Sequence, residues 1–231
     1  MTDAGHPREA PGEDNPGGTA EIRRAATRSV TPRHAASLIL WRQGPQGPEV
    51  LMGLRHASHR FMPNVLVFPG GRVDRADHRA RALSELPDFT RACLERQAPP
   101  SLARAIGIAA ARELEEETGL VLGRQDGKRL LPDLAAVEYL CRAVTPPNRF
   151  RRFNARFLIA PAEAAHGPLR GSGELEELRY FSFEDAFRHK IASITAKVLA
   201  EFRNWLALSP GQREARELIC FRGMDSRTAE H

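Results

Sequence analysis

The sequence predicts a layered α/β domain with a mixed sheet, and three observations lead to this prediction. Short apolar runs bounded by turn residues, such as His34–Trp41 and Val65–Phe68, are typical of buried strands. Two longer segments, 101–118 and 193–208, have the 3.6-residue period of amphipathic helices. Strands that alternate with two main helices favour helices packed on a sheet, as in α/β and α+β domains.

The 231 residues carry a net charge of +5 and are 42% apolar, an ordinary composition for a globular protein. The basic residues are dispersed among 29 acids and aromatics make up only 6%, which argues against nucleic-acid binding as the main function. No apolar run is long enough to cross a membrane, and the N-terminus has no secretory or transit signal. Three cysteines without metal-ligand spacing fit a reducing compartment, so we expect a cytoplasmic protein.

Composition divides the chain into three parts. Residues 1–30 are rich in Gly, Pro and charge and predict a disordered tail. Residues 31–210 carry the strand and helix patterns of the domain, and 211–231 are expected to form a C-terminal extension. Within the domain, the charged segment of about 78–100 interrupts the pattern as an insertion, with helix-forming patches such as RARALSEL. We expect it to act as a lid, because it joins two parts of the candidate site described below.

The domain elements follow in order along the chain. We expect strands at 34–41, 49–56, 65–68, 137–144, 152–160 and 178–182, a turn at 43–48, a short helix at 183–189 and a last strand or tail at 217–222. The helix 101–118 is expected to begin with Ser101 as N-cap and to stop at Gly119. Ile106, Ala110 and Leu114 form its core stripe.

The C-terminal half of that helix, ARELEEETGL, concentrates carboxylates. Residues three and four apart share a helix face, so Glu113, Glu116 and Glu117 converge and Glu115 points elsewhere. Converging carboxylates suit hard cations such as Mg²⁺ or Mn²⁺, and Arg112 can pair with Glu116 or orient Glu113. The alternative is a solvated, salt-bridged helix face.

A glycine loop upstream favours the metal interpretation. LVFPGGRVD places Pro-Gly-Gly directly after a strand, and glycines let backbone groups approach a cation or phosphate closely. Neither motif is specific alone. In this order they predict a site where metals and a pyrophosphate meet.

These residues resemble the Nudix hydrolase family, whose signature has the form GX5EX7REUXEEXGU. Arg112, Glu113, Leu114, Glu116, Glu117, Gly119 and Leu120 match its second half, and the first half corresponds to Gly71 through Asp77, with Asp in place of Glu. The insertion of roughly 27 residues separates the halves, so the role of Asp77 is left open. Reading back from the helix without a gap puts the Glu position on Arg104, which cannot bind a cation. Split boxes of this kind resemble the peroxisomal-type coenzyme A diphosphatase branch.

The resemblance implies an α/β/α sandwich and a metal-dependent pyrophosphohydrolase. It implies that Mg²⁺ or Mn²⁺ is held by Glu113, Glu116, Glu117 and the carbonyl of Gly70, with Arg112 fixing Glu113 as part of the catalytic set. It implies a nucleoside diphosphate linked to a further group as substrate. A general base outside the box varies in the family, and Glu174, Glu176 and Glu177 are the candidates in this sequence, each against the alternative of a charged loop.

The segment before the glycines resembles the coenzyme A motif LLTxRSxxLRxHxGxVxFPGG in part. Arg55 and Arg60 fall at its two arginines, and Phe68, Pro69, Gly70 and Gly71 match. His56, Met62 and Asn64 depart from it. The implied substrate is coenzyme A or an acyl-coenzyme A, bound through Arg55, Arg60, Gly71 and Arg152, with Arg149 and Arg151 as further candidates.

Other interpretations stay open. The substrate can instead be ADP-ribose, NADH or another nucleoside diphosphate derivative. A third alternative is a non-catalytic module that binds a nucleotide or RNA, although such domains usually lack the box glutamates that this chain keeps. A homodimer through the stripe of Leu199, Phe202 and Leu206 is also open.

Overall fold

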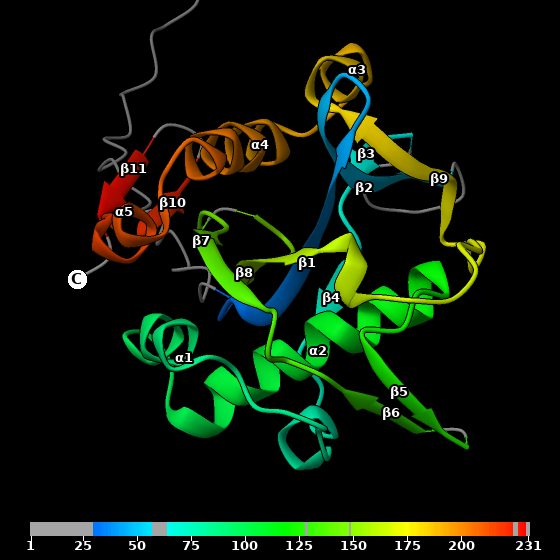
Figure 1. Ribbon diagram of the computed structural model, residues 1–231. Coiled ribbons are helices and arrows are strands. Elements are labelled where there is room, and N and C mark those ends of the chain that lie inside the picture. Colours follow the sequence, from blue (N-terminus) through cyan, green and yellow to red (C-terminus); the bar gives the residue numbers. More distant parts are fainter. Residues whose placement is uncertain (1–29, 57–63, 128, 148, 224–225, 230–231) are drawn as a thin grey trace, which may run out of the picture.

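The structure, a computed structural model, describes residues 30–56, 64–127, 129–147, 149–223 and 226–229 (Figure 1). The predicted N-terminal tail, apart from Val30, and Arg60 and Met62 of the coenzyme A motif lie outside the described residues. Among the described residues, no helix is long and apolar enough to cross a membrane.

Nine strands of the described chain form one mixed sheet, in the order β11-β10-β7-β8-β1-β2-β3, with β4 paired to β1 and β9 paired to β2. Their bounds are β1 Arg33–Gly44, β2 Gly47–Arg55, β3 Leu66–Val67, β4 Gly70–Arg72, β7 Glu138–Val144, β8 Phe153–Pro161, β9 Leu175–Ser182, β10 Ile219–Arg222 and β11 Ser226–Ala229. A separate hairpin joins β5, Gly123–Asp126, to β6, Arg129–Pro132.

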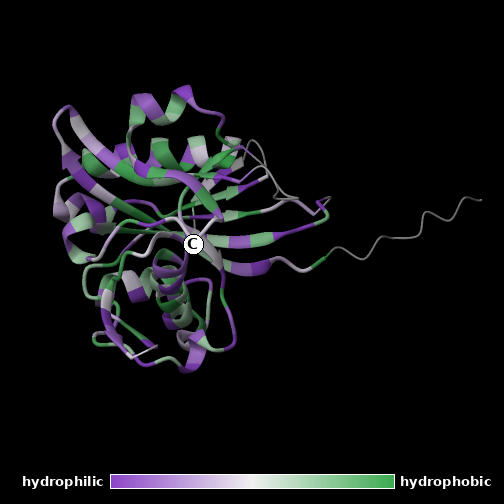
Figure 2. Cartoon of the chain, turned by 90° about the vertical axis from the view of Figure 1, so that its right-hand side faces the viewer, coloured by the Kyte–Doolittle hydropathy of each residue, from purple (hydrophilic) through white to green (hydrophobic). Residues whose placement is uncertain are grey.

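Helices cover both faces of the sheet (Figure 1). They are α1 Asp88–Glu95, α2 Pro100–Thr118, α3 Phe183–Arg188, α4 Ser193–Leu206 and α5 Pro210–Ala215, with 3₁₀ turns η1 Asp77–Arg79 and η2 Ala162–Ala164. One core cluster lies between the sheet and α1 with α2, and the other lies under α4. Figure 2 shows hydrophobic segments gathered between these layers. The predicted mixed-sheet sandwich is confirmed.

The β1–β2 hairpin turns at Pro45 and Gln46, as expected, and pairs Trp41 with Val50. Two expectations differ in detail. Gly70–Arg72 do not merely end a strand but form β4, which pairs with the first half of β1. The β5–β6 hairpin was not predicted, because GRQD and RLLP are only four residues long and carry no apolar alternation.

Helix α2 begins two residues earlier than expected. Pro99 is its N-cap and Pro100 its first residue, so the prediction of Ser101 as N-cap is wrong. Proline suits this first position because the amide hydrogen that it lacks would have no helical partner there. Gly119 ends the helix in the left-handed conformation, as predicted. The stripe of Ile106, Ala110 and Leu114 is buried, which also confirms the prediction.

The insertion is a packed element. Residues 80–87 are not helical, so the helix-forming reading of RARALSEL is wrong: Leu83 donates its amide hydrogen to the carbonyl of Pro132, and Ser84 bonds to Asp133. Helix α1 then buries Leu94 against α2, and the Thr90 hydroxyl donates to the Val137 carbonyl. These contacts reach Arg104 and Gly107 of α2, about 10–20 Å along the helix from Glu113 and Glu117. The role of the insertion as a lid stays a prediction.

The C-terminal part also differs from the expectation of an extension beyond residue 210. Strand β10 pairs parallel to β7, and its Ile219 and Phe221 are buried in the core under α4. The proposed dimer stripe is used inside the chain as well. Leu199 and Phe202 are fully buried against the sheet, so they are not available to a second copy.

Candidate active site

Arg112 is the centre of the carboxylate cluster on α2. Its Nη1 donates to Glu113 at 2.8 Å and to Glu116 at 3.0 Å, which confirms both contacts expected for it. Its Nη2 also donates to the carbonyl of Arg72, at 2.9 Å. One guanidinium therefore ties the glutamate helix to the glycine loop.

Asp77 holds Arg112 from the other side. Its two carboxylate oxygens accept from Nε at 2.9 Å and Nη2 at 3.1 Å, and it is only 1% exposed. It also accepts the amide hydrogen of Asp74, at 2.7 Å. The residue whose role the sequence left open thus has a structural one. Arg104, the position reached by reading back without a gap, pairs instead with Glu85 of the insertion.

Glu117 lies deepest in the cluster, 8% exposed, and its Oε2 accepts the amide hydrogen of Gly70 at 2.9 Å. Glu113 lies beside it and against Gly71: a methyl group on Gly71 would overlap the Glu113 carboxylate. A side chain on Gly70 would overlap Ser37 and the Ala36 carbonyl of β1. The two glycines are therefore needed for the loop to fit between β1 and the carboxylates.

Glu115 points away from this cluster, as predicted, and accepts a hydrogen bond from Gln125 of β5 at 2.7 Å. Glu116 is half exposed at the rim, where Arg112 holds it. The convergence of Glu113, Glu116 and Glu117 on one face is thus confirmed. The alternative of a solvated face fits only the outer members, because Glu113 and Glu117 are largely buried.

The buried carboxylates are electrostatically strained. The pKa of Glu117 is raised to about 8, mainly by burial. The hydrogen bond from the Gly70 amide and the charge of Arg55 lower it, whereas the charges of Glu113 and Glu174 raise it. Burial also raises the pKa of Glu113, although Arg112 opposes it. Burial alone would lower the pKa of Arg112, but Asp77 and Glu113 more than reverse this and raise it. The positive charge of Arg55 does not offset the burial of Glu117.

This charge pattern fits a divalent cation. Carboxylate oxygens are the ligands that Mg²⁺ and Mn²⁺ prefer, and a cation would replace the proton that burial favours on Glu117. In the described part of the chain, no three acidic, His or Cys side chains are already gathered as a finished metal site. These carboxylates already accept hydrogen bonds within the chain: Glu113 and Glu116 accept from Arg112, and Glu117 accepts from the Gly70 amide.

Arg55 ends β2 next to this cluster. Its amide hydrogen bonds the Val65 carbonyl, and its positive charge acts on Glu117. The structure therefore brings Arg55 of the coenzyme A motif to the box. The neighbouring His56 pairs with Glu176 at 3.1 Å.

The candidate bases separate by position. Glu174 acts electrostatically on Glu117, so it lies close to the box. Glu177 lies where the β2–β9 pairing is irregular, and its backbone has a positive φ of 46°. Within the described part of the chain, Glu177 makes no contact with the box carboxylates. Glu176 is engaged by His56. Of the three, Glu174 is the one that the fold brings to the site.

Arg152 lies elsewhere. It precedes β8, and its guanidinium donates to the carbonyls of Thr145, at 3.1 Å, and Val30, at 2.7 Å. The β1–β8 pairing sets this end of β8 beside Arg33, whereas Gly70 pairs with Ser37. The structure thus gives Arg152 a role in holding the chain at the start of β1 and β8. Its binding of substrate stays a prediction.

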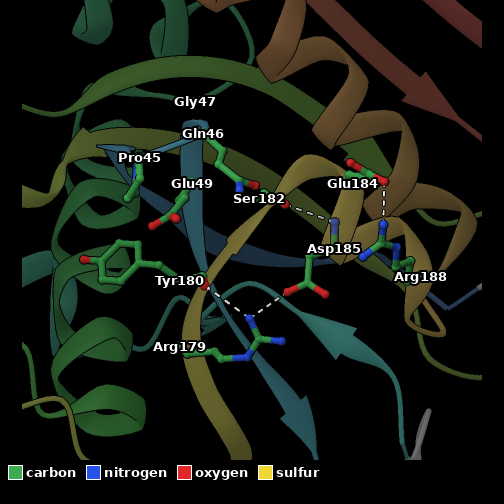
Figure 3. A pocket seen from close by; sticks show the side chains of 10 residues that line it. All are labelled: Pro45, Gln46, Gly47, Glu49, Arg179, Tyr180, Ser182, Glu184, Asp185 and Arg188. Carbon is green, nitrogen blue, oxygen red and sulfur yellow. Dashed lines mark hydrogen bonds and ion pairs between the residues drawn. The ribbon is translucent and has the colours of Figure 1, made fainter.

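A pocket of about 390 Å³ lies away from the box, between the β1–β2 turn and the start of α3 (Figure 3). Its charges satisfy one another: Arg179 pairs with Asp185 at 2.7 Å and Arg188 with Glu184 at 2.5 Å. None of the box residues lines it. We assign it no ligand.

Fold and site together define a class of domain: a mixed-sheet α/β/α sandwich in which buried carboxylates of one helix lie against a glycine loop. Residues 105–202 match the sequence model of the NUDIX domain. The match includes the carboxylate helix and begins after the glycine loop and the insertion. The matched segment is thus similar to part of a NUDIX domain.

Solved structures show the same fold. The chain is similar to a Nudix hydrolase from Alicyclobacillus acidocaldarius, with 24% identity, a TM-score of 0.55 and coverage of 74% of this chain and 90% of that one. It is also similar to the NUDIX domain of Shewanella oneidensis NrtR, solved with ADP ribose, at 13% identity, a TM-score of 0.50 and coverage of 77% and 90%. A sequence comparison with curated proteins gives no match. These likenesses show the fold of the chain.

Sequence reasoning missed two features near the box. The signature identifies the position of Asp77, but the sequence does not show that the insertion folds back and leaves Asp77 beside Arg112. The second is a basic pocket at the start of β1, which is described below. Its arginines are dispersed along the chain, so no local pattern marked it.

Proposed function

We propose that the protein is a divalent-metal-dependent hydrolase that cleaves the pyrophosphate of a nucleoside diphosphate linked to a second group. The observation that carries this is the placement of two buried carboxylates, Glu113 and Glu117, against the backbone of Gly70 and Gly71. A polyanionic pyrophosphate cannot bind bare carboxylates, so carboxylates beside an anion-accessible glycine loop imply a bridging cation.

In this proposal, Glu113, Glu116, Glu117 and the Gly70 carbonyl hold Mg²⁺ or Mn²⁺. The bound cation neutralises phosphate charge and lowers the pKa of a water. Arg112 fixes Glu113 through the hydrogen bond at 2.8 Å, and Asp77 fixes Arg112. Because Gly71 has no side chain, the Glu113 carboxylate can lie directly against the glycine loop. Glu174 takes the proton of the attacking water, as the base that lies near Glu117.

The favoured substrate is coenzyme A or an acyl-coenzyme A. Arg55 supports this choice, because it stands at the first arginine of the coenzyme A motif and its charge reaches the box. Guanidinium groups bind phosphates through two parallel hydrogen bonds. Water would form a new P–O bond, the P–O–P bridge would break, and 3′,5′-ADP and a phosphopantetheine would leave.

A second candidate is a different nucleoside diphosphate derivative. The similar NUDIX domain solved with ADP ribose favours it, since the same fold there accommodates a nucleoside diphosphate sugar. ADP-ribose and NADH would then use the same carboxylates. A non-catalytic binding module fits less well, because Glu113, Glu116 and Glu117 of the signature are all retained.

The test is a hydrolysis panel with Mg²⁺ and Mn²⁺, read by mass spectrometry. The panel contains coenzyme A, acetyl- and longer acyl-coenzyme A, ADP-ribose, NADH and a dinucleoside polyphosphate. Glu117→Gln removes the buried charge, and Glu115→Gln is the matched control on the outward face of the same helix. We expect 3′,5′-ADP from coenzyme A with the native chain and Glu115→Gln, and at least a hundredfold less with Glu117→Gln.

Turnover of ADP-ribose or NADH alone would favour the second candidate. No turnover of any substrate with either metal, together with tight nucleotide binding, would contradict the hydrolase proposal and favour the binding module.

A further inference from the structure

A basic pocket of about 580 Å³ opens where β1 begins and the glycine loop ends. The polar and charged residues that line it are Arg33, His34, Arg72, Asp74, Arg75 and His78. The lining thus includes three arginines and a single carboxylate. They come from two segments, β1 and the loop from β4 to η1, which the β1–β4 pairing brings together.

The cations of this pocket are not used by the fold. Among the described residues, the side chains of Arg33, Arg72 and Arg75 take part in no hydrogen bond or ion pair. By contrast, Arg112 and Arg104, which border the same loop and insertion, are held by carboxylates. Unpaired arginines gathered around one hollow cost electrostatic repulsion, which a bound anion would relieve.

A buried arginine next to His34 adds positive charge to the pocket. The buried Arg156 donates from Nη1 to Nδ1 of His34, at 2.9 Å. Because a guanidinium has only donors, Nδ1 must accept, and the neutral ring carries its proton on Nε2. Burial first, and then Arg156 and Arg142, lower the pKa of His34. His34 is therefore fixed as a neutral donor in a positive field, which suits a phosphate oxygen.

One loop borders both the pocket and the candidate active site. Arg72 follows Gly71 directly, and its carbonyl accepts from Arg112 at 2.9 Å. The amide of Asp74 donates to Asp77, the partner of Arg112. The pocket also reaches Leu102 near the start of α2, whereas Glu113 and Glu117 lie towards the other end of that helix, so a ligand that uses both places must extend along it.

We propose that this pocket binds a phosphate monoester on the ribose of the substrate, separate from the pyrophosphate that lies at the carboxylates. This inference rests on the proposed function and narrows it to nucleotides that carry such a third phosphate. Arg33, Arg72 and Arg75 bind the phosphate oxygens, and His34 and His78 complete the pocket. Coenzyme A, with its 3′-phosphate, has the required chemistry.

The first test measures binding without turnover. Calorimetry of the full chain, without metal, compares adenosine 3′,5′-bisphosphate with AMP. The native chain should bind the bisphosphate roughly tenfold more tightly or better, since hydrogen bonds to charged groups typically contribute this much. Arg33→Gln/Arg75→Gln should remove the preference. Arg124→Gln/Arg203→Gln, which changes two exposed arginines elsewhere by the same charge, should keep it.

Equal affinity for the two probes, or a preference that survives Arg33→Gln/Arg75→Gln, would overturn the inference. Both double variants alter exposed side chains without partners, so their melting temperatures should match that of the native chain and exclude misfolding as the cause.

The second test measures kcat/KM for coenzyme A and 3′-dephospho-coenzyme A, and for NADPH and NADH. In either pair, the phosphorylated substrate should have a kcat/KM more than tenfold higher than its partner, and this ratio should fall in Arg33→Gln/Arg75→Gln. A preference for coenzyme A indicates a bound 3′-phosphate, and a preference for NADPH indicates a bound 2′-phosphate. If coenzyme A is hydrolysed but all ratios are near one, the proposed phosphate pocket is wrong and the proposed hydrolase activity is supported. If nothing is hydrolysed but the calorimetric preference depends on the pocket arginines, the hydrolase fails while the pocket stands.

Discussion

Asp77 and Arg112 form a two-pronged ion pair across 35 positions of the chain, with oxygen–nitrogen distances of 2.9 and 3.1 Å. The insertion separates the two residues in the sequence, yet they form an ion pair next to the carboxylates of α2. Asp77 is buried and Arg112 reaches Glu113 and Glu116 from the same guanidinium. The pair therefore sets the position of the arginine on which two candidate metal ligands depend.

Asp77→Asn should weaken both the fold and the site. The amide keeps the shape but removes the charge, and we expect a loss of about 1–3 kcal/mol in the free energy of unfolding. Turnover of the best substrate should fall about tenfold, because Arg112 is less firmly oriented. Denaturant unfolding and steady-state kinetics measure the two effects. Asp126→Asn, at an exposed hairpin position, is the control, and equal stability of the two variants would contradict the assignment.

Glu117 predicts an unusual dependence of stability on pH. Its pKa in the folded, metal-free protein is raised to about 8 from an ordinary 4.5. The folded state therefore holds this proton more tightly than the unfolded state does. The corresponding stabilisation is complete below about pH 4.5 and is lost as the pH rises through about 8.

Glu117→Gln removes this titration and keeps an oxygen that can accept from Gly70. At pH 8.5 without metal, the variant should unfold at a temperature several degrees above the native chain, and near pH 4.5 the difference should vanish. Added Mg²⁺ should raise the melting temperature of the native chain only. A melting-temperature difference that does not change with pH would show that the Glu117 carboxylate is not strained by burial.

Gly71→Ala should damage the site while sparing the fold. The new methyl group would overlap the carboxylate of Glu113. Glu113 must then move, and we expect at least a tenfold loss of turnover together with weaker activation by Mg²⁺. Gly211→Ala, in α5, meets open space and serves as the control. Unchanged kinetics in Gly71→Ala would mean that Glu113 does not act from the position seen here.

Two glutamates near β9 should behave differently when neutralised. Glu174 lies within electrostatic reach of Glu117, whereas Glu177 lies at the irregular pairing of β2 and β9. Glu174→Gln should reduce kcat by about a hundredfold, in the range expected for loss of a general base, and should remove the acidic limb of the pH–rate profile. Glu177→Gln should leave both unchanged. The reverse result would transfer the role of base to Glu177.

The insertion should contribute to stability more than to turnover. Leu94→Ala removes a side chain that is 2% exposed in the core between α1 and α2, which should cost about 2–5 kcal/mol. Leu83→Ala, at a position that is 48% exposed, should cost little. KM for large and small substrates should be the same in both variants. A selective rise in KM for large substrates would support the lid hypothesis.

The elements with strong local patterns were predictable from sequence. The apolar stripe of α2 and the left-handed stop at Gly119 follow from periodicity and from the conformational freedom of glycine. The shared face of Glu113, Glu116 and Glu117 follows from the geometry of any helix. Elements that depend on partners were less predictable. Residues 80–87 have helix-forming composition but are not helical, because Leu83 bonds to Pro132 at the end of β6 and Ser84 bonds to Asp133.

By itself, the sequence determined the fold class, the carboxylate helix and the glycine loop, because each is marked by a pattern of residues close together in the chain. Only the tertiary structure decided that Asp77 and not Arg104 completes the box, that Glu174 is the glutamate near Glu117, and that β10 belongs to the sheet. It also gathered Arg33, Arg72 and Arg75 around one pocket. These relationships join residues far apart in the chain, and burial and long-range pairing, which no local pattern records, bring them together.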